Sequence, residues 1–229
     1  YVSPEDYADC FRRVYGAIKA VRPAHLVVPQ ALAPFAGPYG ATSSPDAMPI
    51  AHVTYMKRML DAIRASGGVD GVAVHINSRG YSRADVFSTA KVNGNYWSFF
   101  SYKDWLERGI PQALWSLPVF ATESNGYYFW KGGHAEAPAE TYEPGWVQAV
   151  LLEIDRWNHN EALVDGKPVV HCLNFYRWCA SCDGWNIDGS PQEAQILSDL
   201  DEAVGYELTW PERGDPPSAP FTVELGRDT

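Results

Sequence analysis

Several features that would narrow the function are absent from the sequence. No run of 18 apolar residues occurs, so no stretch of the chain is predicted to cross a membrane as a helix. Positive charge is sparse, because 18 Lys and Arg stand against 28 Asp and Glu and leave a formal net charge of −10. Nonspecific nucleic-acid binding depends on basic side chains that neutralise phosphates, so this balance argues against that class of protein. Four cysteines are too few for a disulfide scaffold, and neither a G-x-S-x-G nucleophile motif nor a P-loop occurs.

The composition that remains is that of a folded globular protein. Hydrophobic residues make up 46% of the chain and charged residues 20%, which excludes a disordered chain, a collagen and a coiled coil. A length of 229 residues corresponds to one or two domains. We expect a folded unit over 1–211 and a Pro-rich, polar linker or strap over 212–229. The chain begins at Tyr1 rather than Met and leaves the location open, with a secreted or periplasmic one preferred to the cytoplasm.

Apolar periodicity and cap signals predict that helices and strands alternate along the chain. Helices are expected from Ser3 to the stop at Pro23, around 56–63, and over 103–114, 146–158 and 190–204. Strands are expected over 25–32, 72–77, 117–123 and 168–175. This alternation is typical of βαβ units, so the predicted fold class is α/β with four parallel strands.

The predicted loops are long only where they follow a strand. Helix-to-strand connections are short, whereas the strand-to-helix connections cover 33–51, 78–102, 124–145 and 177–190. Sites in α/β proteins are built at the carboxyl edge of the strands, where these long loops would meet. The loops are also rich in aromatic residues, which disordered segments usually lack, so we interpret them as ordered walls of a cleft. The candidate wall residues are Trp97, Tyr127, Trp178 and Trp185.

Three polar side chains are predicted at the carboxyl ends of two adjacent strands. Alternation over 72–77 places His75 and Asn77 on one face of a strand. Alternation over 117–123 places Glu123 on the same face as Val119 and Ala121. A carboxylate that ends a buried strand is costly unless it is paired or faces a cleft. Glu123 is therefore either a catalytic carboxylate or a strand-end cap, and His75 either assists it or is a satisfied core residue.

Three motifs in this order resemble the carboxyl-terminal half of a clan A glycoside hydrolase, a cellulase-like retaining enzyme on a (β/α)8 TIM barrel. They are Pro4-x-x-Tyr7-Ala8 at the head of a helix, the strand Val119-Phe-Ala-Thr-Glu123, and Trp178 followed by Asp183-Gly184-Trp185. The resemblance covers roughly 3–204 and implies about four of the eight βα units.

The resemblance also implies roles for individual residues. Glu123 matches the nucleophile that ends the seventh strand, His75 resembles the residue that supports it, and Trp178 resembles the sugar platform. The expected function is hydrolysis of a β-linked carbohydrate by double displacement, with no cofactor and no metal ion. Further sugar contacts are expected from Asn77, Tyr127, Trp97 and Trp185.

One part of the family pattern is missing. Retaining hydrolysis needs a second carboxylate about 5 Å from the nucleophile, and the family places it in an Asn-Glu pair ending the fourth strand. No Asn-Glu pair stands in that position here, so the acid/base is expected outside this chain, in a second chain or segment that completes the barrel. Alternatively, a member of the acidic loop group replaces it, namely Glu136, Glu140 or Glu143.

Two other functions compete with hydrolysis. An aromatic cleft without an acid/base could bind a glycan without cleaving it, which would make the chain a carbohydrate-binding module. Cys179-x-x-Cys182, with Cys172 and His171 nearby, could hold zinc, although a single C-x-x-C is better explained by a disulfide or by two free thiols.

Overall fold

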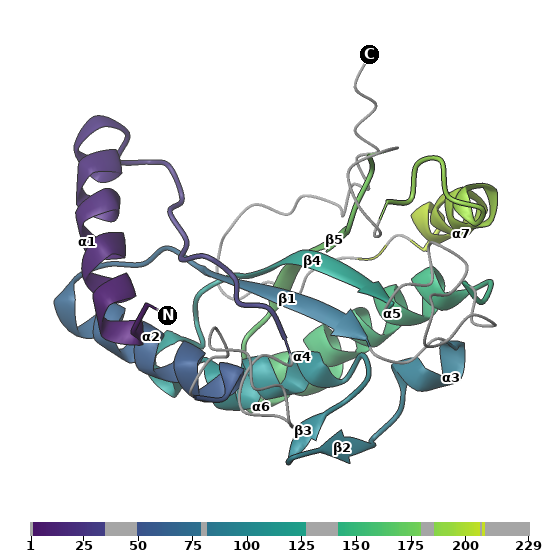
Figure 1. The fold of residues 1–229 in the computed structure, drawn as a ribbon, viewed down its shortest axis with the longest axis horizontal. Coiled ribbons are helices and arrows are strands. Elements are labelled where there is room, and N and C mark those ends of the chain that lie inside the picture. Colours follow the sequence, from purple (N-terminus) through teal and green to yellow (C-terminus); the bar gives the residue numbers. More distant parts are fainter. Residues whose placement is uncertain are drawn as a thin grey trace.

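The computed structural model describes residues 2–34, 50–78, 82–126, 142–179, 186–206 and 208. Its centre is a three-stranded sheet in the order β1-β4-β5 (Figure 1), formed by β1 (Val72–Ser78), β4 (Val119–Gly126) and β5 (Val170–Phe175). Both pairings are parallel. The α/β class with a parallel sheet is therefore confirmed.

Helical segments connect and flank these strands. They are α1 (Pro4–Val21), α2 (His52–Ser66), α3 (Arg83–Val86), α4 (Ser101–Lys103), η1 (Asp104–Gly109), η2 (Gln112–Leu114), α5 (Trp146–Arg156), η4 (Trp157–Ala162), α6 (Leu163–Asp165) and α7 (Glu193–Val204). The predicted start of α1 is confirmed, because the Ser3 hydroxyl accepts a hydrogen bond from the Asp6 amide at 3.1 Å and Pro4 is the first helical residue.

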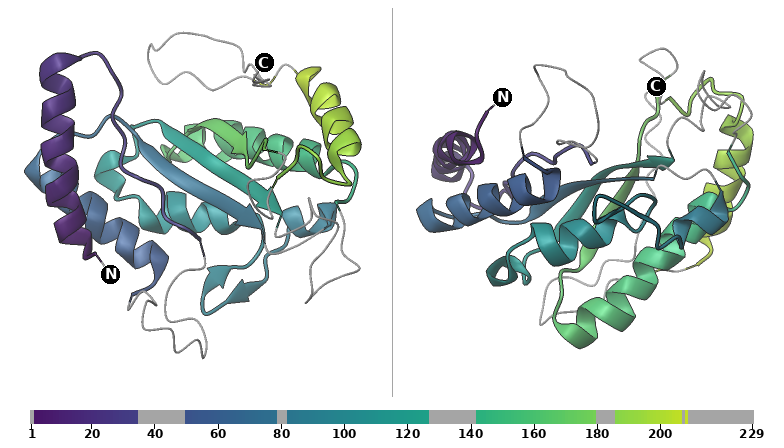
Figure 2. Two further views of the ribbon diagram at one scale, coloured as in Figure 1. Left: turned by 45° about the horizontal axis from the view of Figure 1, so that its top comes forward. Right: turned by 60° about the horizontal axis from the view of Figure 1, so that its bottom comes forward.

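Helices α2, α4 and α5 gather on one face of the sheet (Figure 2). Val72, Val74 and Ile76 of β1 are fully buried and belong to the core that this face forms. Large side chains from the helices fill the same core, among them Met56, Met59, Trp105, Trp146 and Trp157. By alternation along β1, the opposite face carries Ala73, His75 and Asn77.

Residues 25–32, the first of the four predicted strands, do not form a strand. The segment is tied to the residues before β1 instead, because the Asp70 carboxylate accepts from the Val27 amide at 2.7 Å and the Asp70 amide donates to the Val27 carbonyl at 3.3 Å. Pro29 has no N–H with which to bond a neighbouring strand. The Gln30 backbone amide donates to the Tyr7 hydroxyl at 2.7 Å. Its backbone groups are thus satisfied outside the sheet, and the prediction of four strands was wrong for the described residues.

Three helices differ from the sequence prediction. The segment expected as one helix over 103–114 forms α4 and η1, which end at Gly109, and the separate η2. Helix α7 begins at Glu193 rather than at 190, because the Ser190 hydroxyl accepts from the Gln192 amide and the Glu193 carboxylate accepts from the Gly189 amide. These bonds close a turn before the helix. The helix expected over 146–158 continues through a π-helical turn to Asp165.

The predicted loop over 78–102 contains a small hairpin that the sequence analysis missed. Strands β2 (Lys91–Val92) and β3 (Asn95–Tyr96) pair antiparallel around Asn93 and Gly94. Both turn residues have positive φ, 50° and 79°, which is the backbone that an Asn-Gly hairpin turn requires. The predicted tail over 212–229 lies outside the described residues.

Candidate functional site

His75 and Glu123 lie opposite each other in the paired strands β1 and β4, each three residues before its strand ends, so the prediction that Glu123 ends its strand was wrong. Val74 pairs with Ala121, but His75 pairs with Glu123, so Thr122 is an extra residue in β4. Such a bulge shifts the alternation by one position. Glu123 therefore lies on the same face as His75, and the prediction that it shares a face with Val119 and Ala121 was wrong.

The Glu123 carboxylate contacts two side chains of β1. The Asn77 amide Nδ2 donates to Glu123 Oε1 at 2.9 Å, and His75 Nδ1 lies 3.5 Å from Glu123 Oε2. The His75 and Glu123 side chains are 25% and 21% exposed, so the carboxylate is partly shielded but still reaches solvent. The structure thus brings together three of the sequence-predicted site residues. Asn77 and His75 each face a different oxygen of the Glu123 carboxylate.

The backbone beneath these side chains is held by groups that the sequence analysis did not single out. The buried Trp105 indole donates to the His75 carbonyl at 2.8 Å, and the Ser124 hydroxyl donates to the Ile76 carbonyl at 2.8 Å. The Asn125 amide donates to Asn77 Oδ1 at 3.1 Å. Trp105 lies outside the sheet strands, and Ser124 and Asn125 stand in the part of β4 that was predicted to be a turn, so the sequence did not link them to His75 or Asn77.

Burial sets the protonation of the imidazole. Desolvation lowers the pKa of His75 below its ordinary value, and the nearby Glu123 carboxylate opposes this effect without reversing it. The imidazole is therefore neutral at neutral pH, and its approach to Glu123 is a contact between a dipole and a carboxylate rather than an ion pair. This arrangement places the Glu123 carboxylate between a neutral imidazole and a neutral amide.

The described aromatic candidates lie beyond strand ends. Trp178 follows β5 by three residues and is 40% exposed, and Trp97 follows the β2–β3 hairpin and is 36% exposed. A partly exposed indole ring is suited to stacking on a sugar ring. Tyr127 and Trp185 lie outside the described residues.

The zinc alternative loses a ligand in the structure. Cys179 is disulfide-bonded, so its sulfur is not a thiolate that could bind a metal ion. Cys172 is free and half-buried. Within the residues that the structure describes, no group of three or more His, Cys, Asp or Glu side chains is placed to hold a metal ion.

Of the acidic residues considered as a replacement acid, one lies in the described chain. The Glu143 carboxylate accepts from the Arg83 backbone amide at 2.5 Å and fixes the start of α3. Glu136 and Glu140 lie outside the described residues. Among the helices that are described, none has both the length and the apolar character needed to span a bilayer.

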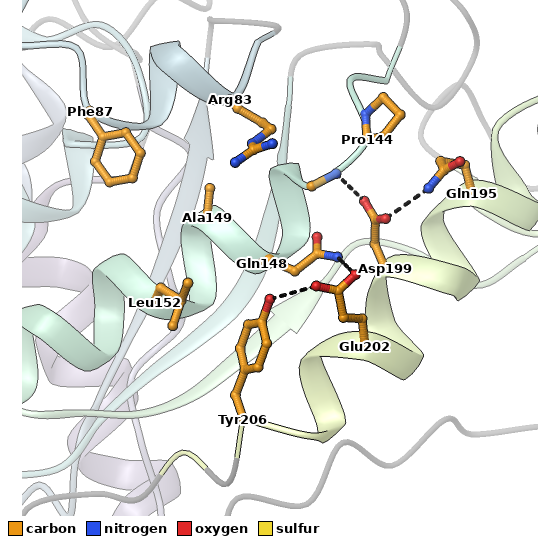
Figure 3. Close-up of a pocket in the computed structure, with 11 residues that line it drawn as sticks. Arg83, Phe87, Pro144, Gln148, Ala149, Leu152, Gln195, Asp199, Glu202 and Tyr206 are labelled. Carbon is orange, nitrogen blue, oxygen red and sulfur yellow. Dashed lines mark hydrogen bonds between the residues drawn. The ribbon is translucent and has the colours of Figure 1, made fainter.

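A cavity of about 420 Å³ between α3, α5 and α7 is separate from this edge (Figure 3). Its carboxylates are engaged within the fold. Asp199 accepts from the Gly145 amide at 2.5 Å and from the Gln195 amide group at 2.9 Å, and Glu202 accepts from the Tyr206 hydroxyl at 3.1 Å. The bond from Gly145 joins α7 to the start of α5. None of the sequence-predicted site residues is among those that line the cavity.

No protein-family model, no curated protein and no solved structure matches the chain. The fold and the site geometry therefore carry the functional argument without support from a relative.

Proposed function

We propose that the chain is the carboxyl-terminal portion of a retaining glycoside hydrolase that acts on a β-linked carbohydrate. The observation that carries the proposal is the Glu123 carboxylate in the second half of β4, with the Asn77 amide at 2.9 Å and the His75 imidazole at 3.5 Å. A carboxylate that is oriented by hydrogen bonds and partly exposed has the geometry of a nucleophile for acetal carbon. Asn77 is the last but one residue of β1 and lies close to the carboxyl edge, where α/β folds place their sites.

The proposed reaction proceeds in two displacements. A Glu123 oxygen attacks the anomeric carbon, the bond to the leaving oxygen breaks, and a general acid protonates that oxygen. Water, deprotonated by the same group, then attacks the anomeric carbon and releases Glu123. His75 orients the carboxylate, and Trp178 and Trp97 provide faces on which sugar rings stack.

The sheet is proposed to be one wall of a (β/α)8 barrel. The three strands of the sheet are parallel neighbours in chain order, with only the β2–β3 hairpin intervening between β1 and β4, and helices lie on one face, as in a barrel wall. In the part of the chain that the structure describes, β5 has no strand neighbour at its far edge, which is a liability for a protein in water. A second chain or segment is proposed to cover this edge and to supply the acid/base.

Covalent labelling tests the nucleophile. A 2-deoxy-2-fluoroglycoside with a dinitrophenolate leaving group needs no general acid for its departure, so the absence of the acid/base does not block the first displacement. We expect mass spectrometry of the digested protein to find the fluoroglycosyl group on the peptide that carries Glu123. Labelling at another carboxylate, or none in the complete catalytic unit, would overturn the assignment.

The mass in solution tests the proposed partner. If the β5 edge needs a cover, the isolated chain is expected to associate, and light scattering after size exclusion should report a mass above 25.4 kDa. A stable, monodisperse particle of that mass would contradict the part-barrel interpretation.

A binding module is the second candidate, and one observation favours it. The side chains in contact with Glu123 among the described residues are an imidazole and an amide, not a second carboxylate. Exposed Trp178 and Trp97 would then bind a glycan that is not cleaved. Glycan binding without labelling or turnover in the complete unit would establish this function in place of hydrolysis.

A further inference from the structure

The Asn77 side chain lies between two groups that fix which way its amide points. On one side is the Asn125 backbone amide, whose N–H lies 3.1 Å from Asn77 Oδ1. On the other side is Glu123 Oε1, 2.9 Å from Asn77 Nδ2. A backbone N–H can only donate, so it must face the amide oxygen, and the amide NH2 must then face Glu123. The reversed amide would set N–H against N–H and oxygen against carboxylate.

This polarity has a consequence for Glu123. The Asn77 NH2 group can donate but cannot accept, so it stabilises the ionised carboxylate and disfavours its protonated form at Oε1. Hydrogen bonds to an ionised acceptor are about twice as strong as neutral ones. The Asn125 backbone amide of β4 holds the Asn77 side-chain oxygen. The Asn77 NH2 group therefore stays directed at Glu123.

We propose that Asn77 is a positioning residue that keeps Glu123 ionised and holds Oε1, so that Oε2 is the oxygen that attacks. The statement that Oε2 attacks rests on the proposed function. The effect of Asn77 on the ionisation of Glu123 follows from the geometry alone. It also changes the role expected from the sequence, since the Asn77 oxygen and one of its N–H groups are used within the protein rather than on a sugar.

The other titratable groups around this edge are few in the described residues. On β1 the imidazole of His75 faces Glu123 Oε2 at 3.5 Å. On β5, the strand beyond β4, the titratable side chains are His171 and Cys172, and the Cys172 thiol donates to Asn174 Oδ1 at 3.2 Å. A change in the titration of Glu123 on altering Asn77 can therefore be compared with the titration of these three groups.

The decisive variant is Asn77→Asp, which preserves shape and replaces only the donor. One carboxylate oxygen still accepts from the Asn125 amide, and the other faces Glu123, so two carboxyl groups share one proton. We expect the apparent pKa of this pair, followed by carbon NMR of the side-chain carboxyls in the whole chain, to exceed that of wild-type Glu123 by at least about one. Asn93→Asp, which adds the same charge at the exposed β2–β3 turn, should leave Glu123 unchanged.

A second variant keeps the test decisive if Asn77→Asp folds poorly. Asn77→Ala removes the donor without adding a carboxyl group, and the pKa of Glu123 should rise by less than in Asn77→Asp. A Glu123 titration equal to wild type in the folded variants would overturn the role of Asn77, whatever the labelling experiment shows. Failed labelling of wild type would instead overturn the proposed hydrolysis, and the titration would still decide whether Asn77 controls the carboxylate.

Discussion

Replacing Glu123 with Gln is expected to lower glycoside turnover by several orders of magnitude while glycan affinity stays within about tenfold. The amide cannot form the glycosyl ester, so the first displacement fails. The side chain keeps its size, and the aromatic faces that would bind sugar, Trp178 and Trp97, are untouched. Turnover is to be measured on the complete catalytic unit with a dinitrophenyl glycoside, and affinity by calorimetry with an uncleaved glycan.

Two controls separate chemistry from binding and from folding. Glu5→Gln removes an exposed carboxylate on α1 that pairs with Arg58 at 2.8 Å, and it should leave turnover unchanged because surface ion pairs contribute little. Trp178→Ala should weaken glycan binding before it affects the chemical step. Turnover retained by Glu123→Gln would show that Glu123 is not the nucleophile.

Chemical rescue adds a result that a structural role of Glu123 would not give. In Glu123→Ala the space of the carboxylate is open, and added azide can attack the anomeric carbon from the same side. We expect azide to restore turnover and to yield the glycosyl azide of inverted configuration. If neither turnover nor glycan binding is found in the complete unit, the resemblance extends to the fold alone, which does not imply function.

The parallel sheet and its helices could be predicted because their signals are local. Val72, Val74 and Ile76 alternate on one face of β1, and Ser3 and Pro4 mark the start of α1. The segment over 25–32 has an apolar composition but contains Pro29, whose missing N–H disfavours a central strand. The Asn93-Gly94 turn, by contrast, was a local hairpin signal that could have been read from the sequence.

The geometry of the site depended on information that the local sequence does not contain. Nothing in Ala121-Thr122-Glu123 marks Thr122 as a bulge, because the extra residue is defined by pairing with β1 and with β5. Period-2 alternation therefore predicted the wrong face for Glu123, and the turn expected at 124–126 is instead the last part of β4. The bond from Asn77 to Glu123 follows from that bulge, so it could not be deduced before the strands were in register.

Trp105→Ala is expected to lower the free energy of unfolding by about 3–5 kcal/mol and to disturb the site from below. The indole is fully buried, packs edge-on against the His52 ring at 4.8 Å, and donates to the His75 carbonyl at 2.8 Å. Removing it opens a cavity in the core and leaves a buried carbonyl without this donor. Urea unfolding gives the loss of stability, and the His75 NMR signals report the change at β1.

Trp105→Phe separates the two parts of this effect, because phenylalanine fills most of the space but has no N–H. Its expected cost is about 1–3 kcal/mol, the range for a buried polar group that loses its partner. Trp115→Phe is the matched control: that indole also donates to a backbone carbonyl, that of Ile110 at 3.0 Å, but it is only partly buried. It should cost less and leave the His75 signals unchanged. Equal losses of stability in the two Phe variants, with the His75 signals unchanged in both, would contradict this role. They would show that the Trp105 bond does not hold the part of β1 that carries His75 and Asn77.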